Sequence, residues 1–439
     1  MIKQLVRFTL NRARGARDRI AYSTRSADVP TLDLDEASNV LIITVDCLRN
    51  DRLSKTGYRR DTTPFLDGFG THTAAIAPAP WTFSSVPSIL SGLYPHRHGA
   101  AYSEDASRNH DLSNPPNGIR DDVFTLPELL DGNGYSSAFF TAIETAAIPI
   151  RGRFPTVGHH HDVDAETLSS HLLDWWNDQT GPRFGYIQFG DLHEPLHEPE
   201  SNPFGSIPDV EGVDRWRFED GDIDRDEFDA YRSAKILLYD TLVREVDTAI
   251  MHLLEELQER EDTIIVVTSD HGEEFWEFTE FERENFTDPR GVYGVGHGHA
   301  LVPPVLEVPI ISNISGLSKQ NSYRSLTDLV PTILRSQSAN IDLDFDGVPL
   351  QETRESPPLS EEIAYGNNQI SVTDDDHHLI HVPETGEVVT IDFETGTELS
   401  DQALEDQLLE FLPASRRTGT AVSVSEDVES RLSELGYTE

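Results

Sequence analysis

The sequence has a single cysteine, Cys47, and very few lysines. One cysteine cannot form an intramolecular disulfide, so a reducing compartment, the cytoplasm, is expected. The lysines are Lys3, Lys55, Lys235 and Lys319, and every other basic residue is an arginine. No apolar run approaches the length of a membrane span, so the sequence predicts no transmembrane helix.

Positive charge is scarce altogether. Lys and Arg number 34 against 78 Asp and Glu, for a formal net charge of -44 at pH 7. Such a surface repels nucleic acid and anionic lipid, which excludes nucleic acid as a partner. The hydrophobic fraction of 37% still indicates a folded protein with a hydrated acidic shell. The composition resembles that of proteins from salt-accumulating halophiles, where high ionic strength screens repulsion among carboxylates.

The N-terminal stretch, residues 1–20, is the exception, because it is locally basic with apolar residues interleaved. It lacks the continuous apolar core of a secretion signal. Two interpretations are open. The stretch is either an amphipathic helix in weak contact with a membrane surface, which would make the protein membrane-peripheral, or a helix docked on the acidic body of its own chain. We favour the second.

Runs of apolar and β-branched residues alternate with helical segments along the chain. This alternation predicts an α/β fold with a doubly wound, mostly parallel sheet sandwiched by helices. The predicted strands are Asn39–Val45, Ser136–Thr141, Phe184–Phe189 and Thr263–Thr268, and the predicted helices are Leu126–Leu130, Ala230–Leu257 and a stretch after Pro87.

The length of 439 residues suits one large domain with smaller additions. We expect a basic N-terminal helix and linker at 1–36, a catalytic domain at 37–315, a small C-terminal α+β subdomain at 316–400 that completes the fold, and an acidic helical tail at 401–439. Within the subdomain, the pattern predicts a helix over Tyr323–Leu334 and short strands over Ile363–Phe393.

Chemically active side chains follow the predicted strands. Asp46 comes directly after the first strand, and Asp270 and His271 come just after the strand 263–268. Ligands of such sheets bind outside the carboxyl ends of the strands, so these residues point to one pocket. Carboxylates, imidazoles and a hydroxyl together suit a divalent metal site with a bound nucleophile. The full set is Asp46, Thr82, Asp191, His193, Asp270, His271, His297 and His299.

The order and context of these residues resemble the alkaline phosphatase and sulfatase superfamily, from about Asn39 to Ile311. The stretch Thr82–Gly99 (TFSSVPSILSGLYPHRHG) resembles the nucleophile segment of that family, whose attacking residue begins a helix ten residues before the glycine matched by Gly92. The resemblance therefore implies that Thr82 is the nucleophile. The N-terminus of a helix holds anionic esters well.

The resemblance also implies a divalent metal ion, which we expect to be Ca²⁺, Mg²⁺, Mn²⁺ or Zn²⁺, one or two in number. The implied ligands are Asp46, Thr82, Asp270 and His271. His193 and His297 are implied to assist catalysis. Substrate binding or a second metal is implied for Asp191, His193, His297, His299 (as the substitute for His297) and Arg49. For Arg49, an ordinary ion pair with Asp51 is nearly as well supported.

The nucleophile segment departs from sulfatases in the strict sense. Their Cys/Ser-x-Pro-x-Arg motif is converted to formylglycine, whereas this chain has Thr82, Ser84 and Val86 at the three positions. Threonine cannot become formylglycine, so phosphoryl chemistry is favoured. Cys47 lacks the maturation motif and is interpreted as a small semi-buried residue beside the pocket. The run His159–His161 is interpreted as a loop, because adjacent imidazoles cannot all face one ion.

We therefore expect metal-dependent hydrolysis or transfer of a phosphate, phosphonate or sulfate ester through a covalent threonine intermediate, on a small-molecule, glycan or lipid substrate. Three alternatives remain open: a strict sulfuric ester hydrolase, a membrane-proximal transferase of a phospho group to a glycan or lipid, and a noncatalytic binding member. A cofactor-independent phosphoglycerate mutase is set aside, because the chain has no room for its large inserted domain.

Overall fold

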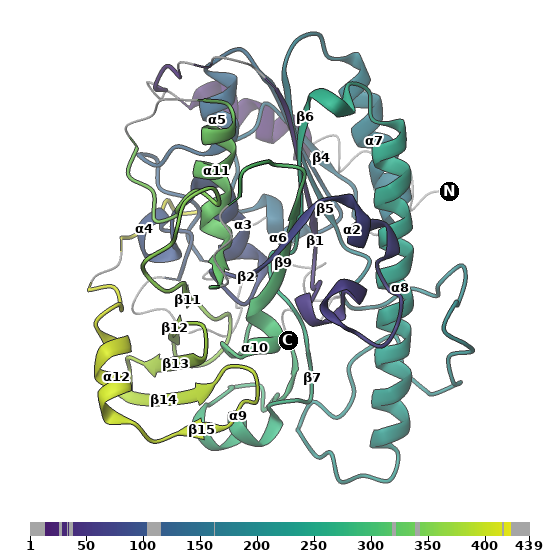
Figure 1. The fold of residues 1–439 in the computed structure, drawn as a ribbon, viewed down its shortest axis with the longest axis vertical. Helices are drawn as coiled ribbons and strands as arrows, with labels where there is room; N and C mark the ends of the chain where they lie inside the picture. The colour runs from purple at the N-terminus through teal and green to yellow at the C-terminus, as the bar shows by residue number, and fades with distance from the viewer. Residues whose placement is uncertain are drawn as a thin grey trace.

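The computed structural model describes residues 14–25, 29–32, 34, 38–102, 116–161, 163–317, 322–338, 343–414 and 417–422. Its centre is an eight-stranded sheet in the order β10-β2-β9-β6-β1-β5-β3-β4 (Figure 1). All neighbouring strands are parallel except β9, which runs antiparallel to β2 and β6. The strands are β1 Asn39–Val45, β2 Thr71–Ile76, β3 Ser136–Thr141, β4 Thr156–His159, β5 Arg183–Phe189, β6 Thr263–Thr268, β9 Glu307–Ser312 and β10 Arg324–Ser325.

Helices cover both faces of this sheet (Figure 1). The long helices α7 (Ala165–Asp178) and α8 (Phe228–Glu256) lie on one face, and α3 (Thr82–Ser91), α5 (Leu126–Asp131) and α11 (Leu329–Ser336) lie on the other. Every residue of β1 is buried, and alternate residues enter different cores, Val40 on one side and Leu41 on the other. The predicted doubly wound sheet is confirmed.

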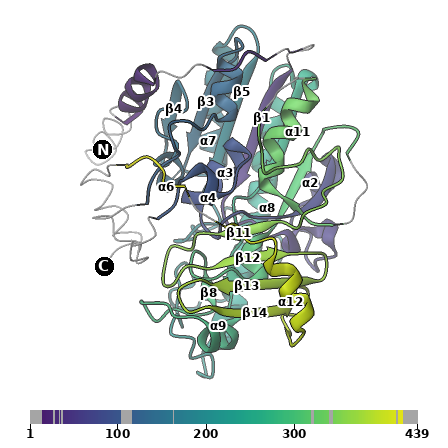
Figure 2. The same cartoon turned by 90° about the vertical axis from the view of Figure 1, so that its left-hand side faces the viewer.

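A second, antiparallel sheet of five strands forms a small C-terminal subdomain beside the large sheet (Figure 2). Its strands are β11 Leu359–Glu361, β12 Ile370–Thr373, β13 His377–Val382, β14 Glu387–Asp392 and β15 Glu398–Leu399. Helix α12 (Gln402–Leu409) packs on it through Leu408. The expected small subdomain and its short strands are therefore present.

The remaining elements are short, and several border the site described below. They are α2 Pro64–Phe69, α4 Pro95–His98, α6 Glu144–Ala147, α9 Thr279–Asn285, α10 Pro303–Leu306, and the two-stranded pair β7 Glu274–Phe275 and β8 Val295–Gly296, with single 3-10 turns at Asn50–Arg52, Ser54–Thr56, Arg260–Asp262 and Leu326–Asp328.

Two predicted helices begin elsewhere. The helix expected over 323–334 begins only at Leu329, because residues 324–325 pair with β2 as an edge strand and Ser325 then caps a 3-10 turn. The helix expected after Pro87 already begins at Thr82. A proline in the second turn leaves one carbonyl unpaired without ending the helix. Helix α11 packs against α3, so residues 324–336 adjoin the large sheet.

The described part of the N-terminal stretch is a helix over residues 14–24, and it lies against the body of the protein. Asp18 pairs with His159 at 2.6 Å, Arg14 pairs with Glu144 at 3.0 Å, and Tyr22 donates to Asp131 at 2.7 Å. These contacts favour the docked interpretation. Residues 1–13 and, at the other end, the expected tail beyond 422 lie outside the described residues. Among described helices, none is long and apolar enough to cross a membrane.

Candidate active site

The carboxyl ends of β1 and β6 bring together two carboxylates and an imidazole. The two strands pair in parallel, with Thr44 opposite Thr268, so Asp46 and Asp270 each follow two residues later. The Nε2 atom of His271 lies 3.2 Å from Asp46 Oδ1 and 3.7 Å from Asp270 Oδ2. All three side chains are fully buried. The structure thus unites three residues that the sequence predicts as metal ligands.

Thr82 joins this group as the first residue of α3. Its Oγ1 lies 3.2 Å from His271 Nε2, and its side chain is buried. Ser85, one turn along the same helix, donates to the carbonyl of Asp270 at 2.6 Å and so ties α3 to the end of β6. The first backbone N–H groups of a helix have no intrahelical acceptor. The Thr82 hydroxyl therefore lies at the helix terminus where such N–H groups begin, in contact with His271.

The residues present fit a divalent cation. Asp46 Oδ2 is buried without a hydrogen-bond partner, and burial together with Asp270 raises the pKa of Asp46 to about 8. His271 Nδ1 contacts the carbonyl of Gly272 at 2.9 Å, which places its proton there and leaves Nε2 free to bind a metal. Gln188 donates to Asp270 Oδ2 at 3.1 Å and fixes that carboxylate. Two buried carboxylates this close need a compensating positive charge.

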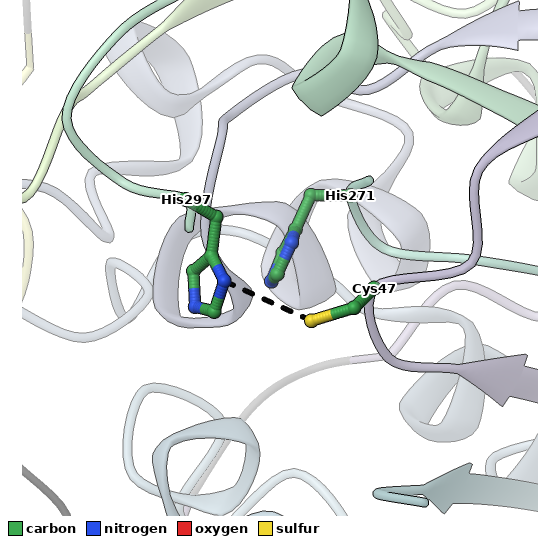
Figure 3. A group of neighbouring side chains, drawn as sticks. All are labelled: Cys47, His271 and His297. Atoms are coloured by element: carbon green, nitrogen blue, oxygen red, sulfur yellow. Dashed lines mark hydrogen bonds between the residues drawn. The ribbon is translucent and has the colours of Figure 1, made fainter. Parts of the chain in front are cut away.

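A second layer of residues adjoins the first. His297 Nδ1 lies 3.1 Å from Glu273 Oε1, its ring centroid lies 4.3 Å from that of His271, and the ring of His193 lies 5.3 Å away. Cys47 Sγ lies 3.7 Å from His297 Nδ1 (Figure 3). Together with His271 and His297, Cys47 forms a group whose donor atoms lie within 4.8 Å of one another.

Cys47 differs from its interpretation as a semi-buried bystander. Its side chain is fully buried, its Sγ lies 3.2 Å from Asp46 Oδ1, and its backbone φ is 63°. This left-handed conformation turns the chain sharply after Asp46, which sequence patterns do not reveal for a non-glycine residue. Burial raises the pKa of the Cys47 thiol well above its ordinary value. The raised pKa opposes formation of the thiolate, which is the form of cysteine that binds metals.

Three predicted residues lie outside this group. Asp191 Oδ1 accepts the backbone N–H of Ala165 at 3.0 Å, at the start of α7. His299 lies against Glu274 and Glu282 instead. The guanidinium of Arg49 pairs with Asp51 and Glu277, each at 2.8 Å. These pairs neutralise it, which agrees with the ion-pair interpretation.

The three adjacent histidines take separate partners. His159 contacts Asp18 at 2.6 Å, the ring of His160 stacks on that of His171 with centroids 3.9 Å apart, and His161 Nε2 lies 3.7 Å from Glu144. They share no ion-binding point, but His159 ends strand β4 and does not lie in a loop.

One lysine near the site, Lys235, has no role predicted from the sequence. It lies on α8 with 1% of its surface exposed, 3.6 Å from Glu194 Oε1 and 4.2 Å from the ring centroid of Trp216. Burial lowers the pKa of Lys235 and raises that of Glu194 to about 8. The sequence does contain one signal for the burial of Lys235, because this lysine lies within an apolar helical pattern in a chain that has few lysines.

Lys235 and Glu194 adjoin His193. The Nδ1 of His193 lies 2.7 Å from the carbonyl of Glu194, and burial lowers the pKa of His193 to about 3. The pair therefore anchors the segment that carries His193, whose imidazole stays neutral at physiological pH.

This chain combines a doubly wound sheet with acidic and imidazole side chains at the carboxyl ends of its central strands. A hydroxyl that begins a helix lies beside them. This combination is that of the alkaline phosphatase and sulfatase superfamily. The model of the Sulfatase family matches residues 38–336, and the chain belongs to this family.

One curated protein is similar to this chain in sequence. The low-salt glycan biosynthesis sulfotransferase Agl7 of Haloferax volcanii is 27% identical over 317 residues, which cover 71% of this chain and 64% of that protein. The chain thus spans less than two thirds of the length of this curated relative.

Two solved structures share the fold. The phosphonate monoester hydrolase of Agrobacterium radiobacter superposes with a TM-score of 0.63 at 17% identity, over 85% of this chain and 94% of that one. A 2-O GAG sulfatase superposes with a TM-score of 0.61 at 17% identity, over 85% and 90%. Identities this low show the fold alone.

Proposed function

We propose that this protein is a metal-dependent enzyme that cleaves an ester of a phosphate or phosphonate through a covalent intermediate on Thr82. The observation that carries the proposal is the position of Thr82 Oγ1, at the first turn of α3 and 3.2 Å from His271 Nε2, beside two buried carboxylates. A nucleophile, an anion-holding helix terminus and a cation site are the three parts that such a reaction needs.

Asp46, Asp270 and His271 would hold the cation, with Thr82 beside it. A bound divalent cation would lower the pKa of the Thr82 hydroxyl and neutralise charge on the transferred group. The N–H groups that begin α3 hold the nonbridging oxygens of the ester. Thr82 Oγ1 then forms a bond to phosphorus as the bond to the leaving oxygen breaks, and the hydroxyl proton passes to solvent.

His297 is placed to protonate the leaving oxygen. Its Nδ1 contacts Glu273 at 3.1 Å, which orients the ring. Burial lowers the pKa of His297, and the Glu273 carboxylate offsets part of that effect. His193, with its low pKa, serves as a neutral contact for the substrate. In the second step, water or an alcohol attacks phosphorus and gives a proton to His297. The bond between phosphorus and Thr82 Oγ1 breaks, and Oγ1 takes a proton from solvent to restore the hydroxyl.

A second candidate is transfer of a sulfuryl group to a glycan. It is supported by the similarity to Agl7, whose name states glycan sulfotransferase, and by the acidic composition that this chain shares with halophile proteins. The same residues would act, with sulfur in place of phosphorus and a sugar hydroxyl as acceptor. Cytoplasmic location and contact of the N-terminal helix with a membrane remain predictions.

The test uses a radioactive label on the transferred group and follows it from the donor ester to the enzyme and then to the acceptor. The protein is purified in high salt, stripped with chelator, and given p-nitrophenyl phosphate labelled with ³²P or p-nitrophenyl sulfate labelled with ³⁵S, with Mg²⁺, Mn²⁺, Zn²⁺ or Ca²⁺. We expect metal-dependent release of p-nitrophenol and acid-stable label on the peptide that contains Thr82. The isotope retained identifies the group, and its appearance on an added oligosaccharide identifies a transferase.

Two variants serve as controls. Thr82→Ser keeps a hydroxyl and should retain label and part of the turnover, whereas Thr82→Ala should lose both. Turnover in Thr82→Ala equal to that of the wild type would overturn the proposal.

A further inference from the structure

A second buried group of metal-binding side chains lies next to the active site and takes no part in the proposed reaction. Glu274 belongs to β7, Glu282 to α9, and His299 to the segment after β8. His299 Nε2 lies 3.1 Å from Glu282 Oε1 and 3.6 Å from Glu274 Oε2. Glu274 is 0% exposed, Glu282 1% and His299 5%. One donor atom from each lies within 4.8 Å of the others.

The backbone fixes the outer oxygen of each carboxylate. The N–H of Phe278 donates to Glu274 Oε1 at 2.6 Å, and the N–H of Gly294 donates to Glu282 Oε2 at 2.6 Å. The other oxygens, Glu274 Oε2 and Glu282 Oε1, are thereby aimed at the imidazole of His299. Hydrogen bonds that orient the remote atom of a ligand are typical of metal sites.

Of the two inner oxygens, Glu282 Oε1 contacts His299 Nε2 at 3.1 Å, but Glu274 Oε2 is not satisfied by the protein. Glu274 Oε2 is fully buried and has no hydrogen-bond partner, and neither has the hydroxyl of Thr279, which is 2% exposed. The same segments of the chain carry an apolar cluster, formed by Phe278, Phe281, Phe286, Ala300, Val302 and Val305. An unpartnered carboxylate oxygen in such surroundings is costly, and one imidazolium can neutralise only one of two carboxylates.

We propose that Glu274, Glu282 and His299 form a second divalent-cation site, distinct from the one at Asp46, Asp270 and His271. One imidazole nitrogen with two carboxylate oxygens favours Zn²⁺ or a similar transition-metal ion over Ca²⁺ or Mg²⁺. The site joins β7, α9 and the segment after β8, so the ion fastens the excursion between residues 274 and 299. His297 within that excursion and Glu273 just before it contact each other beside His271 of the active site.

A metal-free account must also be tested. In it, Glu274 is a protonated acid and Glu282 forms an ion pair with the His299 imidazolium. Burial raises the pKa of Glu274 well above its ordinary value, and a proton or a metal ion can each meet that demand. Glu274→Gln separates the two accounts, because glutamine imitates the protonated acid in shape and charge but is a poor metal ligand.

The experiment uses the full chain, dialysed in high salt against Zn²⁺ and then against metal-free buffer. Metal per chain is measured by plasma mass spectrometry in the wild type, in the catalytic-site double variant Asp46→Asn/Asp270→Asn, and in Glu274→Gln. We expect the double variant to retain one equivalent of Zn²⁺ and Glu274→Gln to lose one equivalent relative to the wild type. Circular dichroism confirms that each variant is folded.

A measurement on the unaltered protein keeps the test independent of folding. Crystals of the wild type grown with Zn²⁺ should show an anomalous difference peak between the three side chains at the zinc edge. The proposal is overturned if Glu274→Gln keeps the full metal content and thermal stability of the wild type, or if the peak is absent while the Asp46 site is occupied.

Discussion

The two donor groups of this molecule invite comparison, because they share ligand chemistry but not surroundings. The group at Asp46, Asp270 and His271 adjoins a helix-initiating hydroxyl and is assembled from the ends of two central strands. The group at Glu274, Glu282 and His299 has apolar neighbours and comes from one excursion of the chain. Metal-ligand chemistry therefore does not by itself identify an active site. A nucleophile and a place for an anionic substrate do.

The largest expected effect concerns the nucleophile. Thr82→Ala should reduce turnover by about 10⁴-fold, since loss of a covalent nucleophile removes the reaction path itself. Its thermal unfolding should match that of the wild type, because Trp81 and not Thr82 is the N-cap residue of α3, and the Thr82 hydroxyl contacts His271. Steady-state kinetics and circular dichroism melts check both. Asp270→Asn should behave alike, and wild-type rates in either variant would mean that the site lies elsewhere.

A matched pair of histidines sharpens the comparison. His297→Asn should lower kcat by about 10² to 10³-fold, as expected for loss of a general acid. His299→Asn should leave kcat within about threefold in folded protein, because its ring contacts only the second group, while lowering the melting temperature. The two residues are separated only by Gly298, which has a φ of 79°. Equal losses of kcat in both variants would break the distinction.

Adjacent glutamates provide a second pair. Glu273→Gln should cost about 10 to 100-fold in turnover, because Glu273 orients His297. Glu274→Gln should cost about 3 kcal/mol of unfolding stability in the presence of Zn²⁺, the contribution expected of a cation at about a hundred times its Kd. Denaturant titration with and without chelator measures the difference. A chelator effect of the same size in Glu274→Gln as in the wild type would contradict the second site.

The smallest expected effect is that of Cys47→Ala, which should change turnover by about threefold or less. Burial opposes ionisation of the thiol, and a thiol makes only weak hydrogen bonds. Metal titration of the variant provides the control. A tenfold loss of metal affinity would instead show that the thiol is a ligand.

Most of the fold was predictable, because buried parallel strands leave a plain signal. β1 and β6 were predicted at their observed bounds, since their runs of β-branched residues suit strands buried on both faces. The bounds of the helix in segment 323–334 were not predicted correctly. Arg324 and Ser325 pair with β2, and that pairing depends on a strand more than two hundred residues away.

The group proposed to be catalytic was predictable in part for the same reason. Asp46 and Asp270 follow strong strands, and Thr82 carries a family resemblance. His299 and Asp191 were grouped with them by motif, but side-chain direction decides their partners, and spacing in a loop does not give direction. Lys235 and Glu274 were missed because each lies in a segment that looks ordinary until its tertiary partners are known.

The position of β1 has a consequence for the nascent chain. This strand is hydrogen-bonded to β5 on one edge and to β6 on the other, and both are synthesised long after it. Until β5 and β6 have been synthesised, both edges of this apolar strand are unpaired, and such edges are prone to pair with other chains. Sheets built from segments that are distant in sequence also form slowly. The acidic residues that dominate the sequence repel neighbouring copies during that interval. The net negative charge of the chain therefore opposes association between copies that are still being synthesised.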